Sequence, residues 1–396
     1  MSPALVVKLR PVGPWRSGPD SGARNRVDPI YHSDSLYAAV TAAMSTLGVL
    51  DEWLEATARN PRGPAVRFSS CFPFIGDLGF VVPPRSMWPP AGAAPLTAAK
   101  VRWKAARFVP LPAVAALLNG QPLDEEQWTV DGVSECLVPT GRPGPFRVSL
   151  RWSAAVDRLT GSVERHSTAC LEFRRDAGLW AIVSFDNEEA RARWSEPVRG
   201  AFRLLADSGF GGERSRGWGR CADPEFVEGT LPELVIPRVE KTVATPEIAV
   251  PAVPPPQEQP VMETAVEEPA AIVALEETAP APVSEPVEAP APEPQPSPAP
   301  AVSSHWLLSL FTPAPEDGVD WKRGNYTVVA RGGRVESPSG FGARKKQLHM
   351  ISEGSVLVAG DAIRGTASDV APDGFAHPVF RAGFALSIPL PEQVTP

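Results

Sequence analysis

Apolar side chains return at helical spacing in two stretches of the chain. In residues 188–208 the stripe consists of Trp194, Val198, Phe202 and Leu205. In residues 33–48 it consists of Leu36, Val40 and Met44. Such spacing places the side chains on one face of a helix, so both stretches are predicted to be amphipathic helices. Gly209 is a suitable stop for the first, Ser33 and Asp34 are suitable caps for the second, and a shorter helix is expected over residues 51–59.

Alternation of apolar and polar residues marks the predicted strands. It is clearest in residues 4–9, 66–72, 147–152, 169–175 and 180–186, where β-branched and aromatic residues predominate. With a further strand after residue 220, the order along the chain is strand, helix, strands, helix, strand. This order predicts an α+β fold of the ferredoxin-like type with insertions.

The pattern stops between residues 239 and 304. This segment holds sixteen of the 47 prolines, many alanines, no glycine and no aromatic residue, so it cannot build a core. Proline and mutually repelling Glu favour an extended, disordered linker with a reach on the order of 200 Å. The expected organisation is therefore an N-terminal domain over 1–238, an acidic linker over 239–304 and a C-terminal domain over 305–396.

The net charge of −8 lies in the linker, which has eleven Glu and one Lys. The rest of the chain has 37 basic and 35 acidic residues. The folded parts are thus slightly basic, and a nucleic-acid partner is not excluded.

The cysteines and the apolar segments indicate the cellular compartment of the protein. Cys71, Cys136, Cys170 and Cys221 form no CxxC pair, so buried thiols are expected rather than a zinc or redox site. No apolar run reaches membrane length, and the N-terminal apolar run is too short for a signal peptide. A cytoplasmic protein without a membrane partner is expected.

The segment GFGGERSRGWGR, residues 209–220, contains five glycines and three arginines. Glycines permit positive φ, so successive amides can converge on an anion, and guanidinium groups add charge-assisted hydrogen bonds. We interpret the segment as a backbone cradle for phosphates, with a flexible surface turn as the alternative. Trp218 either stacks on a base or plugs the segment onto the core. Arg24 and Arg26, in the long loop over residues 10–32, either reach the same anion or are solvated loop charges.

Catalytic chemistry is weakly indicated. His32 precedes a helix, and neither His32 nor His166 has a Lys and a Tyr nearby in sequence to complete a catalytic set. Asp34 is better explained by the positive end of the helix dipole than by metal binding. No catalytic residue, metal or cofactor is therefore predicted.

Several motifs are informative together. They are YHSDSLYAAV (31–40), CFPF (71–74), KVRWKAARFVPL (100–111), VDRLTGSVERHS (156–167), the glycine-rich segment, KKQLHMISEGSVL (345–357) and AHPVFRAGFAL (376–386). Together they resemble the RAMP superfamily of CRISPR proteins and, within it, subunit four of the type III-A Csm effector complex. The last two motifs are similar to the second domain of that subunit.

This resemblance implies two ferredoxin-like, RRM-like domains in a non-catalytic subunit of antiviral defence. The subunit would hold the 5′ tag of the crRNA and dock the large polymerase-like subunit beside the backbone RAMP subunits. The residues expected to bind RNA are Gly209, Gly211, Gly212, Arg214, Ser215, Arg216, Gly217, Trp218, Gly219, Arg24 and Arg26. Those expected on a hairpin near the tag are Arg158, Thr160, Gly161, Arg165 and His166.

The long linker departs from this family, whose two domains are usually joined directly, and puts a rigid relation of the domains in doubt. Two alternatives remain open. One is a RAMP-type crRNA-processing endoribonuclease that uses His32 and His166. The other is a tethered scaffold protein that binds no RNA.

Overall fold

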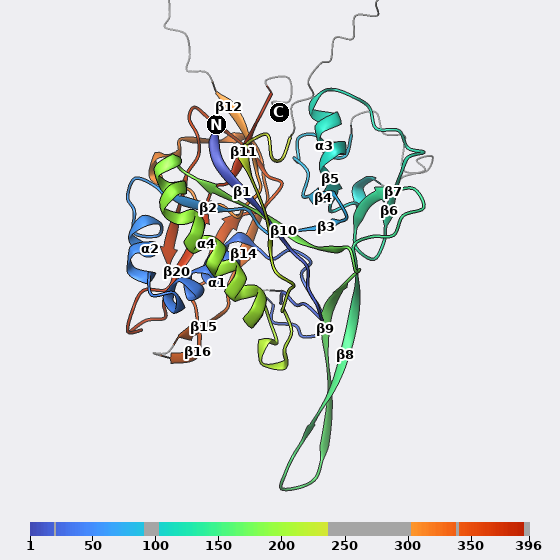
Figure 1. The fold of residues 1–396 in the computed structure, drawn as a ribbon, viewed down its shortest axis with the longest axis vertical. Helices are drawn as coiled ribbons and strands as arrows, with labels where there is room; N and C mark the ends of the chain where they lie inside the picture. The colour runs from blue at the N-terminus through green and yellow to red at the C-terminus, as the bar shows by residue number, and fades with distance from the viewer. Residues whose placement is uncertain (20, 91–102, 237–301, 338–339, 392–396) are drawn as a thin grey trace, which may run out of the picture. The chain divides into compact units, whose positions relative to one another are not determined.

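The computed structural model describes residues 1–19, 21–90, 103–236, 302–337 and 340–391, shown as a ribbon in Figure 1. Most of the expected linker, and residues 100–102 of the motif KVRWKAARFVPL, lie outside the described residues. Met1–Arg238 and Pro300–Pro396 form one compact unit. Strand β12 already begins at Ser303, two residues before the expected start of the C-terminal domain.

Helices form at the three places where the sequence predicts them, and α3 is a further helix that it does not predict. Within the described residues, the α-helices are α1 (Ser33–Thr46), α2 (Leu50–Ala56), α3 (Leu111–Leu118) and α4 (Glu188–Ser208). The 3₁₀ turns are η1 (Trp103–Ala105), η2 (Arg214–Arg216) and η3 (Pro315–Asp317). The predicted stripes of α1 and α4 are buried, and Gly209 ends α4 with a φ of 83°. Both helix predictions are confirmed, and none of the described helices combines the length and hydropathy of a membrane span.

The strands of the N-terminal part form an antiparallel sheet in the order β11-β1-β10-β3-β4-β5, with β2 also paired to β10. Their bounds are β1 (Ser2–Leu9), β2 (Val66–Phe68), β3 (Phe72–Ile75), β4 (Leu78–Val81), β5 (Val109–Pro110), β10 (Ala177–Phe185) and β11 (Glu225–Leu231). Since α1 follows β1 and α4 follows β10, the order β11-β1-β10-β2 is that of a ferredoxin-like domain. The predicted fold is confirmed.

Two hairpins are inserted between α3 and β10. They consist of β6 (Trp128–Asp131) with β7 (Cys136–Pro139), and of β8 (Phe146–Val156) with β9 (Val163–Phe173). The second hairpin is the long ribbon in Figure 1.

A second sheet, in the order β13-β18-β12-β21, lies in residues 302–391. The strands of this region are β12 (Ser303–Leu307), β13 (Val319–Asn325), β14 (Val328–Arg331), β15 (Arg334–Ser337), β16 (Gly340–Arg344), β17 (Leu348–Ile351), β18 (Val356–Ala359), β19 (Gly365–Asp369), β20 (Phe380–Phe384) and β21 (Ser387–Leu390). Counting only the four strands of the sheet along the chain, the order is second, third, first, fourth, which is again ferredoxin-like.

This second ferredoxin-like sheet differs from the first in its crossovers. The described part of residues 302–391 has no α-helix; η3 and the β19–β20 hairpin occupy the two crossovers where helices are expected. The β19–β20 hairpin packs on α1 of the N-terminal part. There the rings of Tyr37 and Phe384 lie edge to face, with their centroids 5.6 Å apart. A helix of the N-terminal part thus supplies apolar surface to the C-terminal strands.

The two faces of the N-terminal sheet bury separate apolar cores. Along β1, Leu5 and Val7 join the core under α1 and α4, whereas Ala4 and Val6 join the core on the opposite face. Residues of the C-terminal part enter both cores, and the indole of Trp306 donates to the carbonyl oxygen of Val82 at 3.1 Å. The doubt that the linker raised about a rigid relation is therefore removed, since the two parts share their cores.

Candidate nucleic-acid interface

The glycine-rich segment leaves α4 and turns back towards β11 through an exposed bend. Gly209, Gly211, Gly217 and Gly219 all have positive φ, as the sequence predicts, and Glu213 adopts the left-handed conformation with a φ of 61°. The bend itself is the 3₁₀ turn of Arg214–Arg216, whose side chains are exposed.

The glycines serve close packing of the backbone. A Cβ atom on Gly211 would lie 2.5 Å from the carbonyl oxygen of Arg16, and one on Gly219 would lie 2.1 Å from that of Phe210. Neither approach leaves room for a side chain. The amide of Gly212 donates to the carbonyl of Arg16 at 2.8 Å, and the amide of Gly219 donates to that of Pro14 at 3.1 Å.

The predicted amide cradle is therefore wrong for several positions. The amides of Gly212 and Gly219 bind the chain near residues 14–16, and the amide of Gly217 donates to the carbonyl of Arg214 at 2.8 Å. A donor engaged within the protein is not offered to a phosphate. The glycines position the arginine bend, and the exposed guanidinium groups carry the charge.

Burial separates the segment into an anchor and an exposed part. Gly209, Trp218 and Gly219 are buried, with Trp218 only 9% exposed. The prediction that these three residues touch RNA is corrected: Trp218 plugs the segment onto the core, and the two glycines pass under the surface. The part that can meet a polyanion is the half-buried Gly211 and Gly212 and the exposed residues 214–217.

Arg16 ties the N-terminal loop to this segment. Its side chain is buried, and its guanidinium donates to the carbonyl oxygens of Arg24 at 3.0 Å, Arg26 at 2.8 Å and Ala169 at 2.6 Å. Burial lowers the pKa of Arg16. Sequence reasoning placed Arg16 in the loop without a role, because its partners are carbonyl groups that carry no residue-type signal.

The loop held by Arg16 supplies a further exposed cation. Arg24 lines the same hollow as residues 211–216, a surface depression of about 820 Å³. Arg26 is exposed two residues further along the loop. Arg24 therefore lies beside the glycine-rich segment.

The β8–β9 hairpin carries the second predicted group. Arg158, Thr160 and Gly161 lie in its turn, where Asp157 accepts hydrogen bonds from the Thr160 hydroxyl at 2.7 Å and the Leu159 amide at 2.8 Å. These hydrogen bonds lower the pKa of Asp157. Arg165 is exposed on β9. The hairpin placement expected for these residues is correct.

The hairpin and the arginine bend meet at one point. Nη1 of Arg216 donates to Oγ of Ser153 at 3.2 Å, and Ser153 is the cross-strand partner of His166. The arginine bend therefore contacts the hairpin at Ser153, on the face opposite to Arg165.

One face of the hairpin is apolar. Its exposed members on β8 and β9 are Val148, Leu150, Trp152, Val156 and Val163. Trp152 is 71% exposed, and Leu159 in the turn is 97% exposed. Exposed apolar side chains gathered in this way are typical of surfaces that bind a partner.

The two histidines of the catalytic alternative lie in different environments. Nδ1 of His32 lies 2.7 Å from a carboxylate oxygen of Glu353, and Nε2 lies 3.1 Å from one of Asp28. Burial lowers the pKa of His32, but the charge of Glu353 and the hydrogen bonds to both carboxylates outweigh this and raise the pKa to about 10. A protonated ring with both N–H groups engaged cannot accept a proton. Nε2 of His166 is itself buried.

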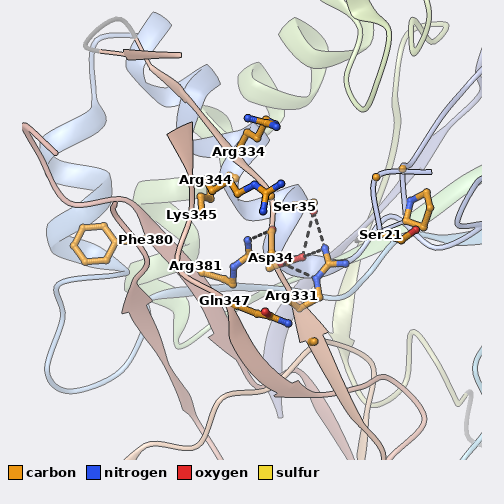
Figure 2. A pocket seen from close by; sticks show the side chains of 17 residues that line it. Ser21, Asp34, Ser35, Arg331, Arg334, Arg344, Lys345, Gln347, Phe380 and Arg381 are labelled. Atoms are coloured by element: carbon orange, nitrogen blue, oxygen red, sulfur yellow. Dashed lines mark hydrogen bonds and ion pairs between the residues drawn. The ribbon is translucent and has the colours of Figure 1, made fainter. Parts of the chain in front are cut away.

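Asp34 joins the two parts of the chain. Its carboxylate, 1% exposed, accepts from Nε and Nη2 of Arg331 at 3.1 and 2.9 Å and from Nη1 of Arg381 (Figure 2). Burial opposes ionisation of Asp34, but the two guanidinium groups hold its pKa well below the usual range. The predicted cap is wrong: the N-cap of α1 is His32, and the hydroxyl of Ser33 accepts from the amide of Leu310 at 2.9 Å.

Among the described ranges, no cluster of three or more His, Cys, Asp or Glu side chains is arranged to hold a metal ion. Cys71, Cys136 and Cys170 are buried free thiols, as predicted, and Cys221 is half-buried.

Comparison with known proteins gives one family match. Residues 301–390 match the family model of the CRISPR Csm4 C-terminal domain. Among curated proteins, none matches significantly.

Solved structures give matches over nearly the whole chain. A chain of the Csm3-Csm4 subcomplex in the type III-A CRISPR-Cas interference complex is similar with a TM-score of 0.54 and 14% identity, over 98% of this chain and 99% of that chain. A chain of the Csm1-Csm4 cassette in complex with cA4 gives 0.50 and 17%, over 98% of each chain. A chain of the cassette in complex with pppApA gives 0.50 and 18%, over 98% of this chain and 99% of that chain. At these identities the likeness concerns the fold.

The described chain has the same fold as chains of the type III-A Csm3-Csm4 and Csm1-Csm4 structures. Residues 301–390 match the Csm4 C-terminal domain, in agreement with the resemblance to Csm4 that the motifs indicate.

Proposed function

We propose that this chain is a non-catalytic crRNA-binding subunit of a type III-A CRISPR effector complex. In this role it holds the 5′ tag of the crRNA in cytoplasmic antiviral defence. The observation that carries the proposal is the exposed bend of Arg214–Arg216, anchored by buried glycines beside Arg24 and the β8–β9 hairpin.

The chemistry of this surface suits an RNA backbone. Arg24, Arg214 and Arg216 are exposed, and Glu213 is the acidic residue lining the same hollow. Guanidinium groups bind phosphates without reading bases, so a subunit that accepts many spacers benefits from this arrangement. The rest of the proposed site, Arg158, Thr160, Gly161 and Arg165, lies on the hairpin that contacts the arginine bend at Ser153.

The partners follow from the likeness to Csm4. The similar structures contain Csm4 together with Csm1 in one case and Csm3 in another. By this likeness, the chain docks the large polymerase-like subunit and a backbone RAMP subunit. The apolar face of the β8–β9 hairpin is a suitable protein-binding surface in the described chain.

The absence of catalysis is supported by the state of the histidines. His32 is locked between two carboxylates, and Nε2 of His166 is buried. Either histidine would need to be released before it exchanged a proton with RNA. Intact repeat RNA after incubation with the purified protein is therefore the expected result, and cleavage that His32→Gln abolishes would contradict it.

The binding proposal is tested by Arg214→Ala with Arg216→Ala in the complex assembled with its partner subunits. We expect reduced crRNA retention for all spacers alike, and a salt slope of binding lower by about 1.4 for two lost single-strand phosphate contacts. Arg191→Ala with Arg193→Ala is the matched control, because these arginines of α4 are ion-paired and exposed elsewhere. Unchanged retention, or loss for particular spacers only, would refute backbone binding at the bend.

A further inference from the structure

A basic cavity of about 890 Å³ lies between the N-terminal loop, the start of α1 and the C-terminal strands (Figure 2). Its charged lining residues are Asp34, Arg331, Arg334, Arg344, Lys345 and Arg381. Five cations thus face one carboxylate, and that carboxylate is already bound by two of them. None of the sequence motifs assigned an RNA contact to this place.

A series of neighbouring hollows links the cavity to the arginine bend. A neighbouring hollow of about 740 Å³ shares Ser35, Ala38, Arg334 and Lys345 with the cavity. The same hollow shares Gly211 and Arg214 with the depression at the glycine-rich segment. The three hollows therefore adjoin one another, and together they are called the groove.

The middle of this groove is lined by small side chains, and its two ends are basic. Ala38, Ala39 and Ala42 of α1 line the middle, where small side chains leave space. Arg214 stands at one end, and Arg334 with Arg344 stands at the other. A groove with cations at intervals and an uncharged floor fits a phosphodiester strand better than a compact anion.

We infer that this cavity binds phosphates of the same RNA strand that crosses the arginine bend, so that the C-terminal part contacts RNA directly. The inference rests on the proposed function, because it extends the path of the proposed ligand. Arg334 and Arg344 make the contacts that are easiest to test, since both are exposed. The guanidinium of Arg334 also donates to the carbonyl of Gly342 within the β15–β16 hairpin, which orients it.

The position of the cavity adds a consequence for the fold. Its walls come from residues 18–38 and from residues 330–381, so it exists only while the C-terminal strands are docked on α1. An RNA strand in the cavity would touch both walls. Bound RNA is therefore expected to raise the melting temperature of the full chain, because a ligand that binds only the folded state stabilises it.

The test compares three double variants of the full chain: Arg334→Ala with Arg344→Ala, Arg214→Ala with Arg216→Ala, and the control Arg191→Ala with Arg193→Ala. The probe is a fluorescent single-stranded RNA of about 12 nucleotides, long enough to occupy several single-strand phosphate contacts. Anisotropy titrations at several salt concentrations give the affinity and the salt slope. For the cavity variant we expect about tenfold weaker binding and a slope lower by about 1.4, with the melting temperature of the unliganded chain unchanged.

The outcomes separate the two proposals. If the cavity variant binds like wild type while the bend variant is weakened, the inference is overturned and the proposed function stands. If both variants bind like wild type, the proposed function fails as well. A polyglutamate competitor identifies an acidic protein as the occupant: polyglutamate binding that the cavity variant loses, with RNA binding intact, also overturns the inference.

Discussion

Two arginine clusters in this chain differ in burial: one is enclosed in the protein and the other is exposed to solvent. In the seam between the two parts, Arg331 and Arg381 are buried against Asp34. At the bend, Arg214 and Arg216 are exposed on a turn held from beneath by glycine contacts. The same residue type therefore supports the fold in one place and is offered to a polyanion in the other, and the difference is the presence of a buried carboxylate.

The energetics of the two clusters differ for the same reason. Removal of one partner from a buried ion pair leaves an uncompensated charge in a poorly solvated place, at a cost of about 3–5 kcal/mol. An exposed pair such as Arg216 with Glu213, 3.3 Å apart, is screened by water and contributes little. Substitutions in the seam should therefore lower stability, and those at the bend should lower RNA binding.

The largest effect is expected for Asp34→Ala. The substitution leaves two buried guanidinium groups without their shared carboxylate, so the free energy of unfolding should fall by about 3–5 kcal/mol. Urea denaturation of the full chain measures this loss. Glu55→Ala, at an exposed pair with Arg59, is the control with an expected change near zero. A change below about 1 kcal/mol for Asp34→Ala would show that the seam is not a buried ion cluster.

Gly219→Val should have the next largest effect. The Cβ would stand 2.1 Å from the carbonyl oxygen of Phe210 at a φ of 82°, so we expect a loss of about 2–3 kcal/mol in unfolding free energy. Gly217→Ala is the matched control, because its φ is also positive but its Cβ would meet open space, and about 1 kcal/mol is expected.

Gly211→Val should also lose stability. The added Cβ would lie 2.5 Å from the carbonyl oxygen of Arg16 at a φ of 89°, so a lower melting temperature is expected together with any loss of RNA binding. A normal melting temperature combined with weaker RNA binding would instead favour a glycine that only shapes a phosphate cradle.

A pH dependence is expected from His32. Its pKa is raised to about 10 in the folded chain, above its ordinary value near 6.5, so the stabilisation is complete below pH 6.5 and declines as the pH rises towards 10. The slope is at most about 1.4 kcal/mol per pH unit. Denaturation between pH 6.5 and 7.5 measures it, about one unit below the ordinary pKa of a cysteine thiol near 8.5. His32→Gln should flatten the profile, and an unchanged slope in this variant would assign the dependence to other groups.

The smallest effect on stability is expected for Arg214→Ala with Arg216→Ala. Both side chains are exposed, so the unfolding free energy should stay within about 0.5 kcal/mol of wild type. Thermal unfolding of the RNA-free chain provides the measurement. A large loss would mean that the bend is part of the structural core and would remove the contrast with the seam.

Local patterns were sufficient for much of the fold. The α4 stripe predicts both ends of that helix, because a heptad-scale pattern and a glycine stop are short-range signals. The order of helices and strands also indicates the first ferredoxin-like sheet. The second sheet keeps the strand order but lacks helices in its described crossovers. The periodicity of residues 302–391 does not predict that α1, a helix of the N-terminal part, packs there.

The candidate site was predictable in its location and not in its chemistry. Composition indicates an arginine-bearing bend at residues 209–220, and the family resemblance implies a hairpin that carries Arg158 and Arg165. Neither shows that the amide of Gly212 is used by Arg16, or that Trp218 is buried. Both facts depend on what the loop of residues 10–32 does after it folds back.

The sequence by itself therefore determined helices α1, α2 and α4, the first sheet, the linker composition and the place of the exposed arginines, since each depends on neighbours a few residues away. Only the tertiary structure decided which charges are buried. Asp34 pairs with Arg331 and Arg381, which lie about three hundred residues further along the chain. Water is excluded at that junction, so the two arginines stabilise the fold there. Arg214 and Arg216 are the same residue type but remain exposed to water.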